Sequence, residues 1–287
     1  MITRNTTQGL FLLRPDPVTA NAFIYCMGVA QLRSGVDVMG FVQMSNHLHD
    51  PIFDRHGTAP SFYRDFHGLL AKCLNARWRR WENFFETKQT NALHLTELED
   101  VIRKLVYTFT NPVAAGLVER VMDWPGANGY EALITGKSLR ATRPTFFFAE
   151  DSELPDEIEL HLRIPPELGD HDEIVAEVKR RVEEFEVAEA ARRAATGRRV
   201  LGRNAVMRQS WQTTPKSRKP RRGLRPTIAA IRLVARLAEI QSRRDWRRDY
   251  RKARRALLAG TPIPFPAGTY WLRRFMGVEV APFEKVI

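Results

Sequence analysis

The sequence predicts an α+β protein whose C-terminal part is mostly helical. Extended and helical patterns alternate over residues 1–130, which leaves an α+β and an α/β arrangement open. Residues 140–170 are rich in proline and acids, and long helical patterns follow them. The 287 residues suffice for one large or two ordinary domains. We therefore expect a first domain over 1–135, an acidic linker over 136–170 and a helical basic domain over 171–287.

The N-terminal part is expected to contain helices separated by extended segments. Asp16 followed by Pro17 is typical of a helix N-cap and first turn, and Gly35 is placed to end that helix. Beyond Gly35, apolar residues alternate with others, as in an extended segment. The expected elements, in order, are a strand over 7–13, a helix over 17–33, extended chain over 36–52 with a turn near Ser45 and Asn46, a helix over 61–81, and a strand or hairpin over 84–95.

Residues 97–110 show the clearest helical pattern of the chain. Their apolar residues recur at helical spacing: Leu98, Val101, Ile102, Leu105, Val106 and Phe109. Tyr107 lies nearly opposite this stripe, where packing gives no reason for a tyrosine. Asn111 follows one turn later. Because a residue before proline is disfavoured in helical backbone, we expect the helix to kink at Asn111 and to restart at Pro112.

A His-Leu-His sequence lies at residues 47–49 of the extended segment. Side chains two apart on a strand share a face, so His47 and His49 would project together, with Leu48 in the core behind them. Two imidazoles and the amide oxygen of Asn111 can hold a divalent cation, and this mixed set suits Mn²⁺ at least as well as Mg²⁺. Such a cation polarises a phosphate, which the Tyr107 oxygen could then attack.

Each of these residues also has a simpler interpretation. His47 and His49 could be polar residues on a solvent-facing strand, Tyr107 an exposed surface residue, and Asn111 the N-cap of a following helix. A phosphodiesterase that uses water as its nucleophile would need an acidic base beside the histidines. Asp50 is the nearest acid, but strand alternation directs it to the opposite face.

The net charge of +12 indicates a polyanionic partner. Residues 196–275 hold 22 Lys and Arg and three acids, a net charge of +19, whereas residues 150–190 hold 15 acids and four bases. These blocks could be solvated helix faces that attract each other. So large a positive block nevertheless favours a protein that binds nucleic acid.

The basic block is expected to form helices over 226–258, opened by Pro226. Aromatic residues alternate there with bases, which suits phosphate contacts combined with base stacking, although Trp246 could also pack in the core. Residues 216–225 resemble a flexible basic arm. The candidate DNA-binding residues are Arg103, Lys104, Arg221, Arg222, Arg243, Arg244, Trp246, Arg247, Arg248, Arg251 and Lys252.

Taken together, these segments resemble the single-tyrosine HUH transposases, and most closely the REP-associated tyrosine transposases. The resemblance covers most of the chain, and its motifs occur in the family's order. They are TTQG at 6–9, FLLRP at 11–15, FVQMSNHLH at 41–49, YTFTNPVAAGLV at 107–118 and WP at 124–125, followed by LGR at 201–203, RRGL at 221–224 and FPAGTYW at 265–271.

The resemblance implies a ferredoxin-like nuclease domain with an antiparallel sheet. It also implies Mg²⁺- or Mn²⁺-dependent cleavage and joining of single-stranded DNA, usually beside hairpins, through a 5′-phosphotyrosine and a free 3′-OH. Matched to the motifs by position, His47, His49 and Asn111 become the metal ligands and Tyr107 the nucleophile. Relatives act as monomers or as homodimers, so the oligomeric state stays open.

One departure from the family follows the histidines directly. The family's strand usually stays apolar after the second histidine, where this chain has Asp50 and Pro51. Because proline lacks a backbone donor, either the strand ends early or the site is deformed. A protein that keeps the HUH scaffold and binds DNA without cutting it is therefore the alternative function.

The remaining features of the sequence are those of a cytoplasmic protein that associates with the nucleoid. The N-terminus lacks a signal pattern, and no run approaches the ~18 apolar residues of a membrane helix. The two cysteines, Cys26 and Cys73, do not suggest a disulfide scaffold. We therefore expect no membrane partner.

Overall fold

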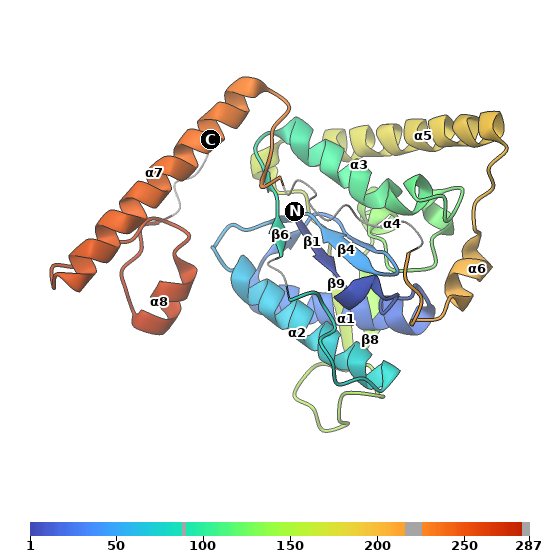
Figure 1. Cartoon of the computed structure of the whole chain (residues 1–287), viewed down its shortest axis with the longest axis horizontal. Helices are drawn as coiled ribbons and strands as arrows, with labels where there is room; N and C mark the ends of the chain where they lie inside the picture. The colour runs from blue at the N-terminus through green and yellow to red at the C-terminus, as the bar shows by residue number, and fades with distance from the viewer. Residues whose placement is uncertain (88–89, 216–225, 283–287) are drawn as a thin grey trace.

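The computed structural model describes residues 1–87, 90–215 and 226–282, and it shows a mixed α+β protein (Figure 1). Its central sheet has four antiparallel strands in the order β3-β4-β1-β6. These strands are β1 (Ile2–Asn5), β3 (Val42–Gln43), β4 (His47–Asp50) and β6 (Asn91–Ala92). The predicted α+β class and the antiparallel pairing are thus confirmed.

Helices cover both faces of this sheet. One face packs against α1 (Pro17–Ser34) and α2 (Ala59–Trp78), and Leu48 of β4 is fully buried in that cluster. The other face packs against α3 (Leu98–Ala114), which is backed by α5 (His171–Thr196), and this cluster takes in Val42 of β3. Leu48 therefore lies in the core behind the two histidines, as predicted.

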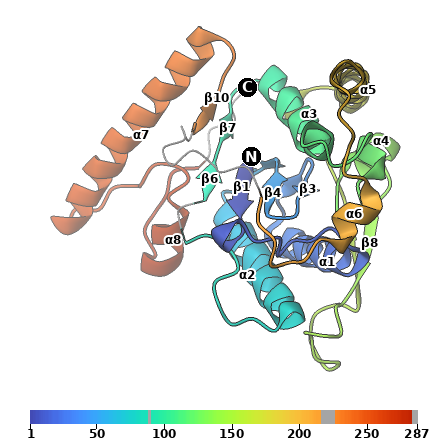
Figure 2. The ribbon, with the colours of Figure 1, turned by 45° about the vertical axis from the view of Figure 1, so that its right-hand side comes forward.

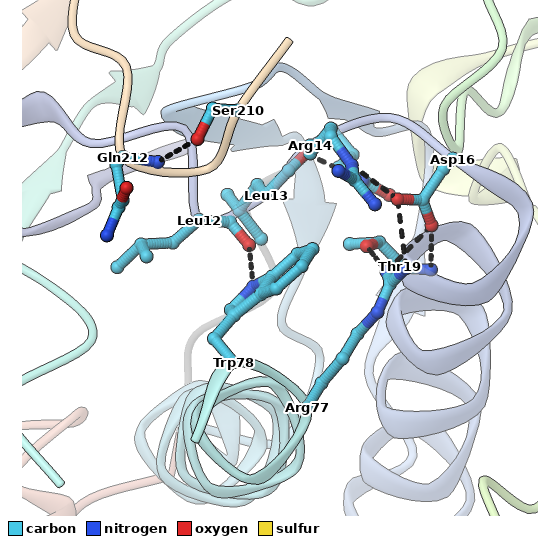
Figure 3. Close-up of polar contacts among 10 residues, drawn as sticks. Leu12, Leu13, Arg14, Asp16, Thr19, Arg77, Trp78, Ser210 and Gln212 are labelled. Carbon is cyan, nitrogen blue, oxygen red and sulfur yellow. Dashed lines mark hydrogen bonds and ion pairs between the residues drawn. The ribbon is translucent and has the colours of Figure 1, made fainter. Parts of the chain in front are cut away.

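Polar contacts fix the two helices that share a face of the sheet (Figure 3). The Asp16 carboxylate accepts a hydrogen bond of 2.9 Å from the Thr19 backbone N–H, which confirms the predicted N-cap of α1. Arg77, near the end of α2, donates to the same carboxylate at 2.7 Å. The neighbouring Trp78 donates from Nε1 to the Leu12 carbonyl at 2.9 Å. The end of α2 is thereby tied to the start of α1.

Helix α3 lies close to the sheet because Gly40 has no side chain. A Cβ at that position would come within 2.8 Å of the Phe109 ring. The helix continues through Pro112 to Ala114, so the predicted restart of the helix at Pro112 is wrong. Proline removes one intrahelical donor, and the next turn still closes because the Ala115 N–H bonds to the Asn111 carbonyl at 3.0 Å.

The first predicted strand is also wrong. Residues 7–9 form a 3₁₀ turn, η1 (Thr7–Gly9), and β1 lies earlier, because Gln8 and Gly9 both adopt a positive φ that an extended strand does not allow. The buried Leu12 and Leu13 that suggested a strand are core residues of a loop. The turn predicted near Ser45 is confirmed, since the Met44 N–H bonds to the His47 carbonyl at 2.9 Å.

Residues of the predicted linker fold against the N-terminal elements. Strands β8 (Leu139–Thr142) and β9 (Glu157–Leu160) pair with each other and contact α1, and Ile158 and Leu160 are buried in the core. The structure thus differs from a linker over 136–170. The buried Ile158 and Leu160 alternate with Glu157 and Glu159, so the acidic composition of this segment gave no indication of their packing.

Helix α5 likewise shares a core with α3. Ile174, Val178 and Val182 are its buried residues, and they belong to the same cluster as Leu105 of α3. The structure therefore differs from the expected boundary, because the predicted second domain begins with a helix that completes the first.

The C-terminal part joins the body through a short parallel pair, β10 (Ile228–Ala229) with β7 (His94–Leu95). Helix α7 (Leu233–Leu258) then runs outward and buries only Ala253. It begins at Leu233 and not at Pro226, which precedes β10. Acidic α5 and basic α7 lie on opposite sides of the molecule (Figures 1 and 2), so these two helices do not cover each other.

The shorter elements complete the described chain. They are β2 (Asp37–Val38), β5 (Ile52–Phe53), η2 (Val121–Asp123), α4 (Tyr130–Thr135), η3 (Pro166–Leu168), α6 (Arg203–Arg208) and α8 (Tyr270–Met276). In the described ranges, no helix combines the length and the apolar character that crossing a membrane requires.

Candidate functional site

His47 and His49 lie side by side on a regular strand. All four residues of β4 pair with β1, with His47 opposite Asn5 and His49 opposite Thr3. The ring centroids of the two histidines are 4.9 Å apart. Pro51 follows the last paired residue, so it ends the strand without separating the histidines.

A neighbouring side chain orients each imidazole. The Nδ1 atom of His47 lies 2.8 Å from the amide oxygen of Asn46, and Nδ1 of His49 lies 2.8 Å from the hydroxyl of Thr3. When Nδ1 donates in both contacts, the basic lone pair of each ring is on Nε2, the usual arrangement of a metal-ligating histidine. Sequence reasoning missed both partners. Asn46 adjoins the motif and could have been found, whereas Thr3 required the correct position of β1.

Tyr107 of α3 reaches the same place. Its ring centroid is 5.2 Å from that of His49, and 46% of the residue is exposed. The Lys104 ammonium lies 5.0 Å from the Tyr107 ring centroid, one turn earlier on the helix. Burial lowers the pKa of Lys104 from its ordinary value, the Arg103 charge lowers it further, and Asp100 raises it. The site thus combines two histidines, a phenol and a half-buried ammonium.

His47, His49 and Asn111 are the residues that could hold a divalent cation. Asn111 follows Tyr107 by one turn of the continuous α3 helix and is half-buried. Over the ranges that the structure describes, no three His, Cys, Asp or Glu side chains gather as a metal-binding group. A third protein donor beside the histidines would therefore be of another type, which is the part predicted for Asn111.

Asp50 is buried on the opposite face of β4, as strand alternation predicts. It is fully buried, and neither carboxylate oxygen has a hydrogen-bond partner among the described residues. Burial raises the pKa of the Asp50 carboxyl well above its ordinary value, although the Met1 ammonium lowers it. An acid on that face cannot serve as a base beside the histidines, which removes the candidate base of a water-using phosphodiesterase.

Replacing Asp50 by Asn is expected to stabilise the protein increasingly as the pH rises. Above the ordinary Asp pKa of about 3.9, the unfolded chain has released a proton that the native Asp50 carboxyl retains, so this residue costs stability as pH increases. We expect Asp50→Asn to match the wild type near pH 4 and to exceed its free energy of unfolding by about 1–3 kcal/mol at pH 7. Urea denaturation at both pH values measures this difference, and a constant difference would contradict the prediction.

The predicted DNA-binding residues of α7 form an exposed stripe. Arg244, Arg247, Arg248, Arg251 and Lys252 recur at helical spacing, and all five are exposed. Arg248 also forms ion pairs with two aspartates of the same helix. The five side chains are exposed and α7 lies on the other side of the molecule from acidic α5, so their positive charge is available to an external anion.

The other predicted DNA-binding residues do not belong to this exposed stripe. Arg243 is half-buried and bonds to Glu239, and Trp246 stacks on Tyr250 while its indole N–H donates to the Ala267 carbonyl at 2.7 Å. Trp246 thus packs against Tyr250, but at 39% exposure it does not lie in the core, as its simpler interpretation required. Arg103 is exposed on α3. The predicted Arg221 and Arg222 lie outside the described residues.

Comparison of the chain with protein-family models, curated proteins and solved structures finds no match. The geometry of the site and the charge distribution are therefore the basis for a functional assignment.

Proposed function

We propose that this protein is a metal-dependent endonuclease and strand-transferase for single-stranded DNA, with Tyr107 as its nucleophile. The proposal depends mainly on one observation: the Tyr107 ring is 5.2 Å from His49, whose own ring is 4.9 Å from His47. The sheet order β3-β4-β1-β6 gives further support, because it is the order of a ferredoxin-like fold, which the HUH resemblance implies. This resemblance, to REP-associated tyrosine transposases, also favours hairpin-containing DNA.

Three side chains would hold the cation. The Nε2 atoms of His47 and His49 and the amide oxygen of Asn111 supply two nitrogen ligands and one oxygen ligand, a set that Mn²⁺ or Mg²⁺ accepts with water completing the shell. Such a cation, when bound, polarises a phosphate and offsets the charge on its oxygens. Asn46 and Thr3 hold the two imidazoles in the orientation that ligation requires.

Tyr107 would carry the chemical step. Its oxygen loses a proton and bonds to phosphorus, while the bond between phosphorus and the 3′ oxygen breaks. The leaving oxygen takes up a proton and becomes a free 3′-OH, and the 5′ end stays attached as a phosphotyrosine. A strand 3′-OH that attacks this ester reverses the step and joins DNA. The Lys104 ammonium, 5.0 Å from the ring centroid, stabilises negative charge on the phenolate and on the phosphate.

The proposal is tested by covalent capture. The protein is incubated with Mn²⁺, or with Mg²⁺, and with labelled single strands that contain hairpins, and the products are separated under denaturing conditions. We expect a protein–DNA adduct that retains a label on the 3′ side of the cut, loses a label on the 5′ side and disappears with EDTA. A folded protein that binds these strands but forms no adduct on any of them would favour the alternative, a DNA-binding protein without nuclease activity.

The basic stripe of α7 is expected to bind the DNA backbone. Replacing Arg247 and Arg251 together by Ala should weaken single-strand binding roughly tenfold at low salt and reduce the slope of log affinity against log salt by about 1.4, since each lost phosphate contact contributes about 0.7. Fluorescence anisotropy over a salt series measures both values. A double variant of the exposed Arg33 and Arg192, with the same loss of charge outside α7, should leave the slope unchanged. Equal slopes for the two variants would contradict the assignment.

A further inference from the structure

A cavity of about 630 Å³ opens at the β6 edge of the sheet, between the first turn of α2 and helix α7. Its apolar lining includes Ile2, Ile52, Tyr63 and Leu93. Its polar lining includes Asn91, His94, Glu239 and Arg243. None of these residues belongs to the candidate nuclease site. Cavities with apolar walls and a few polar groups are the usual binding sites for small molecules and for single groups of larger ones.

One row of the sheet runs from the candidate nuclease site to a residue of the cavity lining. Thr3 of β1 is opposite His49 on one side and opposite Asn91 on the other. Cross-strand partners share a face, and neighbouring strands are about 4.8 Å apart, so Asn91 lies about 10 Å from His49 on the same face. This separation matches about three stacked nucleotides at about 3.4 Å each.

One residue of the cavity lining also contacts helix α3. Met1 lines the cavity, and its sulfur accepts a hydrogen bond of 3.8 Å from the Thr108 hydroxyl, next to Tyr107 in sequence. The Lys104 charge also acts on the Met1 ammonium. Met1 therefore contacts both the cavity and the helix that carries Tyr107.

The polar groups at the cavity suit a phosphate and a base. Glu239 bonds to both His94, at 2.9 Å, and Arg243, at 2.7 Å, so its charge is compensated. Arg243 has five N–H donors, of which three form hydrogen bonds with Glu239 and Thr227. The buried Tyr63 hydroxyl has no hydrogen-bond partner among the described residues. The lining thus offers donors to an anion at one end and an apolar surface with polar atoms at the other.

We propose that this cavity binds one unstacked nucleotide of the DNA strand, about three nucleotides from the bond that is cut. The base contacts the apolar walls and the Asn91 amide hydrogen-bonds to its edge, while Arg243 donates to its phosphate. The proposal rests on the proposed function for the identity of the strand. It assigns base preference at one flanking position to Asn91, apart from the residues that cut.

Binding of single nucleotides tests the proposal without requiring cleavage. Saturation-transfer NMR is recorded on the full chain in EDTA, with each of the four deoxynucleoside 5′-monophosphates as probe, for wild type, Ala59→Phe, Asn91→Ala and Tyr107→Phe. Ala59 begins α2 and lines the cavity, so a phenyl group there fills it. Ala76→Phe makes the same change at an exposed position of the same helix and serves as the matched control.

We expect at least one nucleotide to bind wild type, Ala76→Phe and Tyr107→Phe alike, and to bind at least tenfold more weakly to both cavity variants. The proposal would be overturned if a nucleotide bound Asn91→Ala and wild type equally, or if wild type showed no saturation transfer at millimolar nucleotide. If Ala59→Phe does not fold, the comparison of Asn91→Ala with wild type is the test. Nucleotide binding without any covalent adduct would leave the cavity assigned and refute the nuclease. A covalent adduct without nucleotide binding would support the nuclease and refute the cavity assignment.

Discussion

Tyr107→Phe is expected to abolish covalent attachment of the protein to single-stranded DNA. The substitution removes only the phenol oxygen, the atom proposed to bond to phosphorus. We expect adduct formation to fall by at least about 10³-fold, as is usual when a nucleophile is removed. Folding should be little affected, because the residue is 46% exposed and a surface change of this kind alters stability by about 0.5 kcal/mol or less.

The measurement is a time course of denaturing gels with Mn²⁺ and a labelled hairpin strand. DNA affinity, measured by anisotropy, should stay within about twofold of wild type, since the aromatic ring and the neighbouring Lys104 are retained. Tyr250→Phe is the matched control, because it removes a hydroxyl from the basic helix α7 and leaves the site intact. An adduct that persists in Tyr107→Phe would refute the assigned nucleophile, even if cleavage itself is real.

Much of the candidate site could be predicted because its residues lie close together in sequence, on one strand or on one helix. The alternation of side chains on a strand put His47 and His49 on one face and Asp50 on the other, and helical periodicity put Tyr107 opposite the apolar stripe of its helix. The structure adds what spacing cannot supply. The approach of His49 to Tyr107 depends on α3 packing over Gly40, a contact between residues far apart in sequence.

The errors in the predicted fold have common physical causes. A hydrophobic run such as residues 10–13 packs in the core as a loop, because burial and not backbone extension is what its composition requires. Tertiary contacts keep Pro112 inside α3, although local preference would break the helix there. Strand β9, which pairs with β8, carries its core residues between acids, so composition suggested a linker where alternation indicated a strand.

A charge at Val178 is expected to unfold the core that supports α3, although this residue lies in the predicted C-terminal domain. Val178 is fully buried in the cluster formed by α3, α5 and their neighbours. Val178→Asp would bury a carboxylate that has no partner, at a cost on the order of 4 kcal/mol or more. The free energy of unfolding of an ordinary domain is about 5–15 kcal/mol, so this loss removes much of the stability of the fold.

Val187→Asp supplies the matched control, since the same change in the same helix falls on a residue that is 71% exposed. Circular dichroism melting should show a markedly lower midpoint for Val178→Asp alone, and the adduct assay should lose activity in parallel, because α5 supports the helix that carries Tyr107. If α5 instead belonged to a separate unit, Val178→Asp would melt that unit only and would leave adduct formation unchanged. The outcome therefore decides whether residues 1–135 suffice for the site or whether the helix that follows the acidic segment is part of it.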